Sequence, residues 1–468
     1  MSKVAQYLNE HLQGEVTTAD AVRERFSTDA SILQIVPDMV AYPRSTSDIR
    51  KIARFSWQLA EKGHKLPITV RGAGSDQTGA AIGSGVVVNM LAHMTSIYEL
   101  DPKQKLVRVQ PGVTFGGLND ALALHGLTVP CGPVSAPYST IGGAIANNAS
   151  GVQSDKYGST REWVKQLEVV LANGDVIQTG RISKRELGRK KGQQDFEGEI
   201  YRGIDTILSD HAELINSIAL DVPDNIGYNI VDVERKDGSV DLTPLFVGSQ
   251  GTLGIVSEVI MKAIEVARET LVGAIAFASH DSARDGLDAL RELRLTSLEL
   301  IDGRLFEAAL AEGKRYPFYA GARDQGDVAA VVVFEVDDHS GRAKKHIAKK
   351  IAKLFASDDS VTVAIEKAGE AAEALRALRY VTALTVGAHK SDDSTPPILD
   401  GAYIPPERFE DFVKATAGLE TKYHVQLPLY GHAGQSIYYA RPLFDFAKVS
   451  ERQKLFKLLN DWSLAVTA

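Results

Sequence analysis

Two glycine-rich segments constrain the fold of this chain more than any other feature of its sequence. The first is RGAGSDQTGAA at residues 71–81, and the second is STIGGAIANNASG at residues 139–151. Glycine has no Cβ, so backbone N–H groups in such turns can approach and surround a phosphate. Either segment alone would also suit an ordinary tight turn, because short glycine motifs often match by chance. Together they indicate a binding site for a large, dinucleotide-like cofactor.

The residues around the first segment disfavour a Rossmann fold. Leu66–Arg71 reads as a strand, and Val86–Val88, after the glycines, reads as a second strand and not as an amphipathic helix. A Rossmann fingerprint needs a helix N-terminus directly after its glycines, where the pyrophosphate binds. The glycine turn is therefore expected to connect two strands.

The second segment lies in a window without charge. Residues Ala121–Ser154 contain no Asp, Glu, Lys or Arg, although these types make up 24% of the chain. Such a window is expected to be buried, and its polar groups must be satisfied either within a core loop or on a bound ligand. The groups available are the side chains of Thr140, Asn147, Asn148 and Ser150, with Gly142, Gly143 and Gly151 allowing close backbone approach.

Length and composition limit the number of domains, the classes of partner and the cellular location that this chain can have. A chain of 468 residues exceeds one ordinary core and suggests two domains. The net charge of −8 gives no basic footprint for nucleic acid. No signal-peptide pattern opens the chain and no apolar run approaches the ~20 residues of a membrane span, so we expect a cytoplasmic protein, with peripheral membrane association left open. The single cysteine, Cys131, excludes a disulfide or a cysteine-ligated iron–sulfur cluster within this chain, and we expect it to be buried.

Beyond residue 265, strands alternate with amphipathic helices. The predicted strands are 271–277, 297–301, 329–336 and 361–365, and a helix with apolar residues on one face follows the first and the third. Two such β-α-β units predict a ferredoxin-like sheet with helices on one face. The lysines of the second helix are interpreted as a solvated face, and the basic run Arg181–Lys191 as a solvated loop.

Five segments resemble the vanillyl-alcohol oxidase / p-cresol methylhydroxylase superfamily of FAD-dependent oxidoreductases. They are VPDMVAYPRSTSDI (36–49), VRGAGSDQTGAAIGSGVVVNM (70–90), VQPGVTFGGLNDALALHGLTVP (109–130), STIGGAIANNASGVQSDKYGST (139–160) and VGSQGTLGIVSEV (247–259). The resemblance implies an α+β fold in three parts. These are an N-terminal helical segment (1–35), a two-subdomain p-cresol methylhydroxylase-type FAD-binding domain (36–265) and a ferredoxin-like α/β substrate or cap domain (266–468).

The same resemblance implies how FAD is held. The first glycine turn would hold the pyrophosphate, the central loop would lie along the flavin and ribityl chain, and the GTLGIV turn would support the adenine side. Some members tether FAD through a His in the first turn, where this chain has Ser75 and Asp76, so we expect non-covalent FAD. The residues implied to bind FAD are Arg71, Gly72, Ala73, Gly74, Ser75, Asp76, Thr78, Gly79, Pro133, Thr140, Gly142, Gly143, Asn147, Ser150, Gly151, Gly254 and Ile255.

Within the superfamily, the segments PPERFEDF (405–412) and YGHAG (430–434) most resemble the D-lactate and D-2-hydroxyglutarate dehydrogenase branch. That resemblance implies oxidation of a 2-hydroxy acid by hydride transfer to flavin N5, while a base takes the hydroxyl proton. Electrons would pass on to an acceptor not yet identified, an iron–sulfur region or a quinone being the two candidates. In that branch an Arg at a helix end pairs with the substrate carboxylate, and Arg379 matches it, with a structural ion pair as the alternative role.

The catalytic end departs from that branch. Relatives carry a second His seven residues after the first, and the pair binds a divalent metal. Here His432 is present but Tyr439 takes the second position, and the chain ends at Ala468 before a segment that supplies a further ligand and the base. We expect no metal, His432 as a candidate base, and Tyr439 as a reluctant phenolic acid or base because its ordinary pKa is ~10. A truncated longer protein, with this chain as its N-terminal flavin part, is favoured over a short member with altered chemistry.

Two other functions stay open on the sequence. Ile437, Tyr438 and Tyr439, where relatives have metal-site residues, would suit an FAD oxidase of an alcohol, polyol or sugar. A flavoprotein electron-relay module without its own turnover is the other alternative. Peroxide formation with alcohols would indicate the oxidase, and redox activity with artificial donors alone would indicate the relay.

Overall fold

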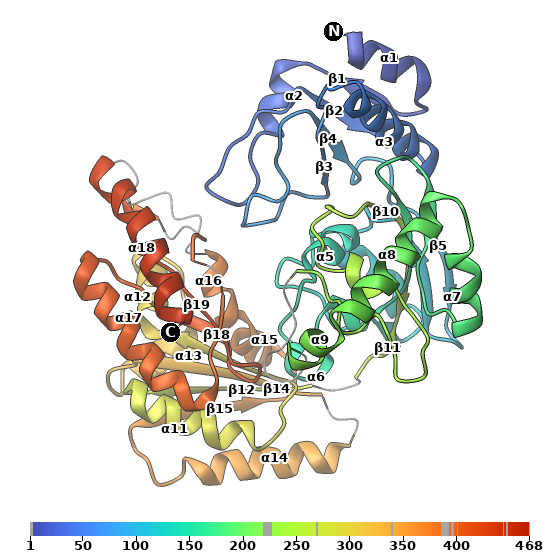
Figure 1. Cartoon of the computed structure of the whole chain (residues 1–468). Helices are drawn as coiled ribbons and strands as arrows, with labels where there is room; N and C mark the ends of the chain where they lie inside the picture. Colours follow the sequence, from blue (N-terminus) through green and yellow to red (C-terminus); the bar gives the residue numbers. More distant parts are fainter. Residues whose placement is uncertain are drawn as a thin grey trace. The chain divides into compact units, whose positions relative to one another are not determined.

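A computed structural model describes residues 3–218, 227–267, 270–337, 340–384, 393–394, 397–399, 401–442, 444–445 and 448–467. The chain forms two compact units (Figure 1). Unit 1 comprises Met1–Gly151 and Gly158–Val266, and unit 2 comprises Val152–Tyr157 and Ala267–Ala468. The short segment Val152–Tyr157 thus belongs to unit 2, although unit 1 supplies the chain on both sides of it. Within the described ranges, no helix has both the length and the apolar character that crossing a bilayer requires.

Unit 1 contains a four-stranded sheet in the order β1-β2-β4-β3. Its strands are β1 (Glu15–Thr17), β2 (Met39–Tyr42), β3 (Ile68–Arg71) and β4 (Val86–Asn89). Strands β2, β4 and β3 are parallel, and β1 pairs antiparallel with β2. Helices α1 (Lys3–His11) and α3 (Thr46–Glu61) bury their apolar faces in the core of this sheet. The strands predicted on both sides of the first glycine segment are confirmed as β3 and β4.

The second sheet of unit 1 has five antiparallel strands in the order β5-β6-β10-β8-β9. Its strands are β5 (Ile97–Asp101), β6 (Leu106–Val109), β8 (Val164–Val170), β9 (Val176–Gln178) and β10 (Ile255–Lys262). A separate two-stranded ladder pairs β7 (Leu127–Thr128) with β11 (Ile264–Glu265). The other helical elements described here are α2 (Asp20–Arg25), α4 (Phe115–Ala123), α5 (Ile141–Asn147), η1 (Thr160–Glu162), α7 (Lys184–Lys191), α8 (Phe196–Asp210), α9 (Ala212–Ile218) and α10 (Thr243–Phe246).

Two expectations for unit 1 are wrong. The charge-free window is only partly buried, because Leu124 at the end of α4 is 86% exposed and Tyr138 is 58% exposed. The basic run predicted as a loop forms α7, whose start is fixed by a capping box between Ser183 and Glu186. Cys131, by contrast, is buried as expected.

Unit 2 is built on a seven-stranded antiparallel sheet in the order β15-β12-β14-β13-β18-β19-β17. Its strands are β12 (Leu271–Phe277), β13 (Ser297–Asp302), β14 (Ala330–Val336), β15 (Val361–Glu366), β17 (Ala402–Tyr403), β18 (Leu429–His432) and β19 (Ile437–Ala440). The order of the first four strands is that of a ferredoxin-like sheet, which confirms the prediction. Strands β18, β19 and β17 extend it beyond β13.

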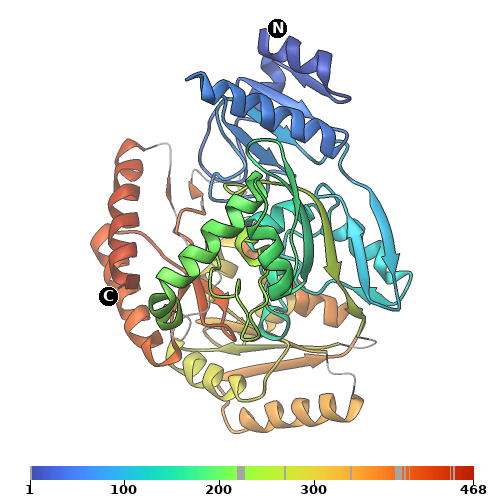
Figure 2. The same ribbon diagram turned by 45° about the vertical axis from the view of Figure 1, so that its right-hand side comes forward.

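Helices cover both faces of this sheet, so the expectation of helices on one face is wrong. One core combines α11 (His280–Arg291), α14 (Gly341–Leu354), α17 (Phe409–Tyr423) and α18 (Val449–Thr467). The other combines α12 (Gly303–Ala311), α13 (Pro317–Arg323) and α15 (Glu370–Ala377). Figures 1 and 2 both show α11 and α14 on the same side of the sheet. The physical reason is that every residue of β12 is buried, and a strand that is apolar on both faces needs a layer on each.

Shorter elements complete the described part of unit 2. They are α6 (Ser154–Tyr157), η2 (Leu378–Tyr380), α16 (Val381–Leu384), β16 (Asp393–Ser394), η4 (Pro406–Arg408) and β20 (Phe444–Asp445). Element η2 follows α15 directly and leads into α16, so Arg379 lies in the 3-10 turn between two α-helices.

Candidate functional site

The first glycine turn of unit 1 presents a run of free backbone donors. Among the residues that the structure describes, no acceptor receives the N–H groups of Gly72, Ala73, Gly74 or Ser75. Gly74 and Gly79 have φ angles of +74° and +87°, which other residue types rarely adopt. Successive unpaired N–H groups in such a turn form a concavity that binds anions such as a pyrophosphate.

Arg71, expected among the FAD residues, directs its side chain into the protein. Its Nη1 donates to the carbonyl oxygens of Thr28 (2.8 Å) and Ala81 (3.3 Å), and the guanidinium lies over the Phe26 ring. Burial lowers its pKa below the ordinary arginine value. The Arg71 side chain therefore stabilises the glycine turn through hydrogen bonds within the protein.

The two glycine-rich segments meet within unit 1. Asp76 accepts hydrogen bonds from the N–H groups of Thr78 and Ala80 through one oxygen, and from Asn147 Nδ2 (2.8 Å) through the other. A Cβ on Gly72 would lie 2.1 Å from Thr140 Oγ1, so only glycine fits there. Thr140 in turn caps α5 by accepting from Gly143 N. The structure thus brings the predicted pyrophosphate turn and the predicted flavin loop together.

Several predicted FAD residues are explained by packing inside unit 1. A Cβ would clash with Pro111 at Gly142, with the Gly132 carbonyl at Gly151, and with Val169 at Gly254, next to the buried Ile255. Pro133 accepts a backbone bond from Ala136, and Ser150 forms a bridge with Ser159.

Gly143 differs from these glycines, because a Cβ there would meet only Thr140 Oγ1, at 3.2 Å. The buried Ser139 Oγ also lacks a hydrogen-bond partner among the described residues. An open glycine, an unpaired hydroxyl and free turn amides fit a bound FAD.

In unit 2, the candidate catalytic residues share one face of the sheet. Register places Glu299 of β13 opposite His432 of β18, and Tyr430 of β18 opposite Tyr439 of β19. Alternate residues of a strand point to the same face, so these four side chains lie on the side covered by α12, α13 and α15. The structure therefore places His432 and Tyr439, both named as candidates from the sequence, on the same face of the sheet.

Arg379 joins this face through a buried ion-pair network. Its Nε donates to Glu299 Oε2 (2.8 Å) and its Nη1 to Glu335 Oε1 (2.7 Å), while Nη2 has no partner among the described residues. Burial lowers the pKa of Arg379 and the two glutamates raise it, with a net rise. The structural ion pair considered as an alternative role for Arg379 is present. Its Nη2 makes no hydrogen bond among the described residues.

The His432 imidazole lies beside a carboxylate. Its Nδ1 lies 3.6 Å from Glu299 Oε1 and has no hydrogen-bond partner among the described residues. Burial lowers the pKa of His432, and Glu299 partly opposes the shift. The imidazole is therefore deprotonated near neutral pH and ready to take a proton.

Tyr439 belongs to an aromatic cluster around His432. Its ring stacks on Tyr430 at 5.1 Å and meets the His432 ring edge-on at 6.4 Å. The Arg441 guanidinium lies over the Tyr430 ring, 5.4 Å from its centre. In the part of the chain that the structure describes, no three His, Cys, Asp or Glu side chains are grouped to hold a metal ion.

The segment Val152–Tyr157 contacts the same sheet at β13 and at the turn between β18 and β19. Asp155 accepts from Leu298 N (2.6 Å), Gln435 Nε2 donates to Ser154 O (2.8 Å), and Lys156 and Tyr157 both donate to Asp337 (2.5 Å each). Burial raises the pKa of Asp155 to about 7.

Sequence reasoning missed Glu299, Glu335 and Asp155. The two glutamates had a signal, since a charge inside the apolar strands SLELID and AVVVFEV implies a buried partner. The docking of Asp155 in unit 2 had none.

Comparison with known proteins supplies the family. Residues 37–180 match a family model described as an FAD binding domain, and residues 267–468 match the C-terminal domain of FAD linked oxidases. The chain is 26% identical over 465 residues to a D-2-hydroxyglutarate dehydrogenase of Pantoea ananatis, covering 97% of this chain and 45% of that protein. It is 30% identical over 426 residues to the glycolate oxidase subunit GlcD of Bacillus subtilis, covering 89% and 75%. The chain spans about half the length of the D-2-hydroxyglutarate dehydrogenases that it matches.

Solved structures show the same fold. The p-cresol methylhydroxylase superposes with a TM-score of 0.69 at 15% identity, over 99% of this chain and 86% of that one. A 4-ethylphenol oxidase from Gulosibacter chungangensis gives 0.69 at 14% identity, over 98% and 86%. These likenesses confirm the predicted fold class. The matched FAD binding domain and FAD linked oxidase domain make FAD the cofactor. The chain belongs to the FAD-linked oxidases, combining their FAD binding domain with their C-terminal domain.

Proposed function

We propose that this chain is the flavin part of an FAD-dependent dehydrogenase that oxidises a 2-hydroxy acid of the D-lactate or D-2-hydroxyglutarate type. The observation that carries the proposal is the position of Glu299 between Arg379 and His432. One of its oxygens accepts from Arg379 (2.8 Å), and the other lies 3.6 Å from His432. A carboxylate-binding cation and a neutral base thus lie side by side, as a substrate with adjacent carboxylate and hydroxyl groups requires.

Each residue has a defined role in this proposal. Arg379 binds the substrate carboxylate through Nη2, the nitrogen that its glutamate partners leave unused. His432 takes the hydroxyl proton, and the Glu299 carboxylate stabilises the imidazolium that forms. Bound FAD supplies the two-electron acceptor for this chemistry, and the turn amides of residues 72–75 with Thr140, Gly143 and Asn147 hold it.

The electrons must then leave through a group outside these 468 residues. The chain has one cysteine, too few for a cysteine-ligated cluster. We therefore propose that the electrons pass to an external acceptor, either an iron–sulfur region or a quinone.

A second candidate is an FAD oxidase of a neutral alcohol, polyol or sugar. It is favoured by the Tyr430–Tyr439 stack, which offers an aromatic surface, and by the two glutamates that already engage Arg379. Neutral substrates would need no free cation. Peroxide production with such substrates, together with no response to hydroxy acids, would select this alternative.

The test of the main proposal is anaerobic reduction of the flavin. D-Lactate and D-2-hydroxyglutarate are added separately to the flavin-loaded protein, with L-lactate as the stereochemical control. Loss of the visible flavin bands with a D-hydroxy acid alone supports the proposal. Unchanged bands with every hydroxy acid, in a protein that dithionite still reduces, would contradict it.

A further inference from the structure

We propose that Arg291 is a positioning residue that fixes the hairpin of β18 and β19, and through it His432, in the arrangement used for catalysis. The catalytic part of this inference rests on the proposed function, because it takes His432 as the base. Arg291 is the last residue of α11, which packs on the opposite face of the sheet.

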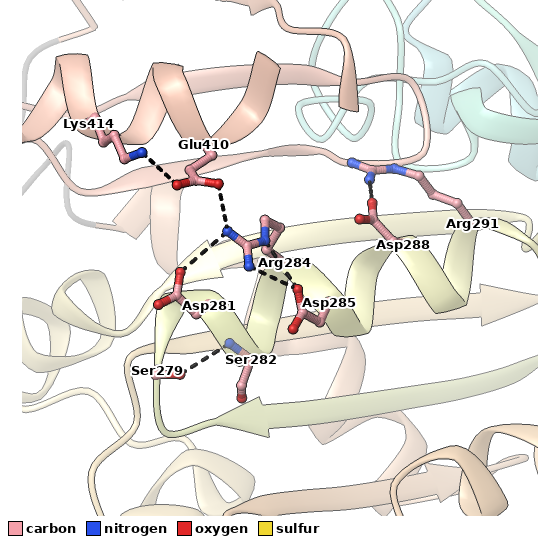
Figure 3. Close-up of polar contacts among 9 residues, drawn as sticks. All are labelled: Ser279, Asp281, Ser282, Arg284, Asp285, Asp288, Arg291, Glu410 and Lys414. Atoms are coloured by element: carbon pink, nitrogen blue, oxygen red, sulfur yellow. Dashed lines mark hydrogen bonds and ion pairs between the residues drawn. The ribbon is translucent and has the colours of Figure 1, made fainter. Parts of the chain in front are cut away.

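One guanidinium ties both strands of the hairpin. Arg291 Nε donates to the carbonyl oxygen of Ala433 (3.1 Å), and Nη2 donates to the hydroxyl of Tyr438 (2.8 Å). Ala433 directly follows His432, and Tyr438 directly precedes Tyr439. The third nitrogen pairs with Asp288 on the same helix, as Figure 3 shows. All three guanidinium nitrogens are therefore engaged, and the side chain is 17% exposed.

The two acceptors need this donor. Ala433 and Tyr438 are both fully buried, and burial raises the pKa of Tyr438 to about 12, so its hydroxyl is neutral. Ala433 O otherwise accepts, among the described residues, only a longer bond from Ser436 N (3.3 Å). Ser436 itself has a φ of 59°. A strained turn with buried polar groups stays in one conformation only when its surroundings fix it.

Arg291 acts through the hairpin and not on the substrate. Tyr438 packs against Phe409 in the core beneath α11 and α17, 4.7 Å between ring centres. Strand alternation places His432 and Tyr439 on the other face. Arg291 is thus separated from the candidate catalytic face by the sheet, and its influence on His432 passes through the backbone of Ala433 and Tyr438.

Arg284 on the same helix offers a matched control. It forms ion pairs with Asp281, Asp285 and Glu410 (Figure 3). Within the described ranges, none of its hydrogen bonds or ion pairs involves the hairpin. Arg284→Met therefore removes the same charge from α11 and leaves the hairpin untouched.

The experiment compares Arg291→Met, Arg291→Lys, Tyr438→Phe and Arg284→Met in the flavin-loaded full chain. Hydrogen–deuterium exchange of peptides covering residues 429–440 measures the hairpin without reference to activity. Flavin reduction kinetics with the active hydroxy acid then separate kcat from KM. Thermal unfolding and flavin content verify that each variant is folded.

We expect faster exchange of the hairpin in Arg291→Met and a kcat lowered roughly 10- to 100-fold, because small misplacement of a catalytic group has effects of that size. KM should change less than about twofold, since Arg291 does not touch the substrate. Arg291→Lys and Tyr438→Phe, which each keep part of the clamp, should fall between wild type and Arg291→Met. Arg284→Met should match wild type in both assays.

Unchanged hairpin exchange in a folded Arg291→Met protein would overturn the inference. So would faster exchange with an unchanged kcat, or a loss confined to KM. A wild-type protein that oxidises no hydroxy acid contradicts the proposed function instead, and hydrogen exchange alone then decides whether Arg291 holds the hairpin.

Discussion

His432 and Glu299 face each other across two paired strands, with Nδ1 of the imidazole 3.6 Å from Oε1 of the carboxylate. The strand register fixes this separation. Burial lowers the pKa of His432, Glu299 raises it, and Arg379 lowers it again. A base kept neutral by burial, with a carboxylate ready to stabilise its protonated form, is suited to take a proton from a hydroxyl group.

Changing Glu299 to Gln should move the pH profile toward acid. The substitution removes the charge that raises the pKa of His432, so the imidazole stays neutral at lower pH. The acidic limb of the kcat/KM profile, where activity falls as the base becomes protonated, should shift to lower pH. The maximum should also fall roughly 10- to 100-fold, because the imidazolium loses its carboxylate. Stopped-flow flavin reduction across pH measures both effects. Glu410→Gln is the control, because Glu410 is an exposed ion-pair partner of Arg284. A shift of the acidic limb to higher pH in Glu299→Gln would refute the proposed effect of Glu299 on His432.

Changing Arg379 to Lys should weaken substrate binding. Lys keeps the charge between Glu299 and Glu335 but has no planar fork to reach a third carboxylate. A lost charge-assisted hydrogen bond of about 1.5–3 kcal/mol should raise KM roughly 10- to 150-fold. Arg323→Lys is the control, because Arg323 pairs with Glu307 and not with either glutamate that binds Arg379. Steady-state kinetics test this, and a KM equal to that of wild type would show that Arg379 is purely structural.

Asp155 should make unit 2 less stable as pH rises. Burial raises its pKa from 3.8 to about 7. Between these pH values the carboxyl group is protonated in the folded protein but ionised in the unfolded chain, so a rise in pH favours unfolding. Stability should fall by up to ~1.4 kcal/mol per pH unit between those values. Asp155→Asn should remove this slope, with little difference from wild type near pH 4 and greater stability at pH 8.

Urea unfolding at several pH values measures that slope. Asp120→Asn, at an exposed position of α4, should leave the slope as in wild type. An Asp155→Asn protein with the wild-type slope would show that Asp155 does not titrate as described.

Gly143 should decide flavin retention. A Cβ there meets only Thr140 Oγ1, at 3.2 Å, so a larger side chain fills space outside the protein core. Gly143→Val should purify without flavin, because it occupies room that the cofactor needs. Gly203→Val in α8, where a Cβ would meet no atom within 4 Å, is the control for valine in a helix. Absorbance at visible wavelengths reports the result. Flavin bound at the wild-type level would mean that the central loop is misassigned.

The sequence predicted most where local chemistry decides structure. The apolar runs of β12 and β14 and the glycines between β3 and β4 were sufficient to place these elements. The sequence was less informative about contacts between residues that are far apart along the chain. The prediction of a loop at residues 181–191 was wrong because Ser183 and Glu186 form a capping box, and their Ser-x-x-Glu spacing is present in the sequence.

For the site, the sequence indicated the residues but not their partners. His432, Tyr439 and Arg379 were proposed from resemblance. The network that joins Arg379 to His432 depends on Glu299 and Glu335, which lie in strands predicted only as apolar. Arg291 lies 142 positions from Ala433, and no local pattern links the two. Such contacts follow from strand order and register, which a single sequence does not specify.

Oxidation of a D-hydroxy acid by the bound flavin is tested by the visible spectrum of the purified protein, recorded before and after anaerobic addition of D-lactate or D-2-hydroxyglutarate. We expect flavin bands that bleach with a D-hydroxy acid and persist with L-lactate. Bands that persist with every hydroxy acid, in a flavoprotein that dithionite bleaches, would contradict it.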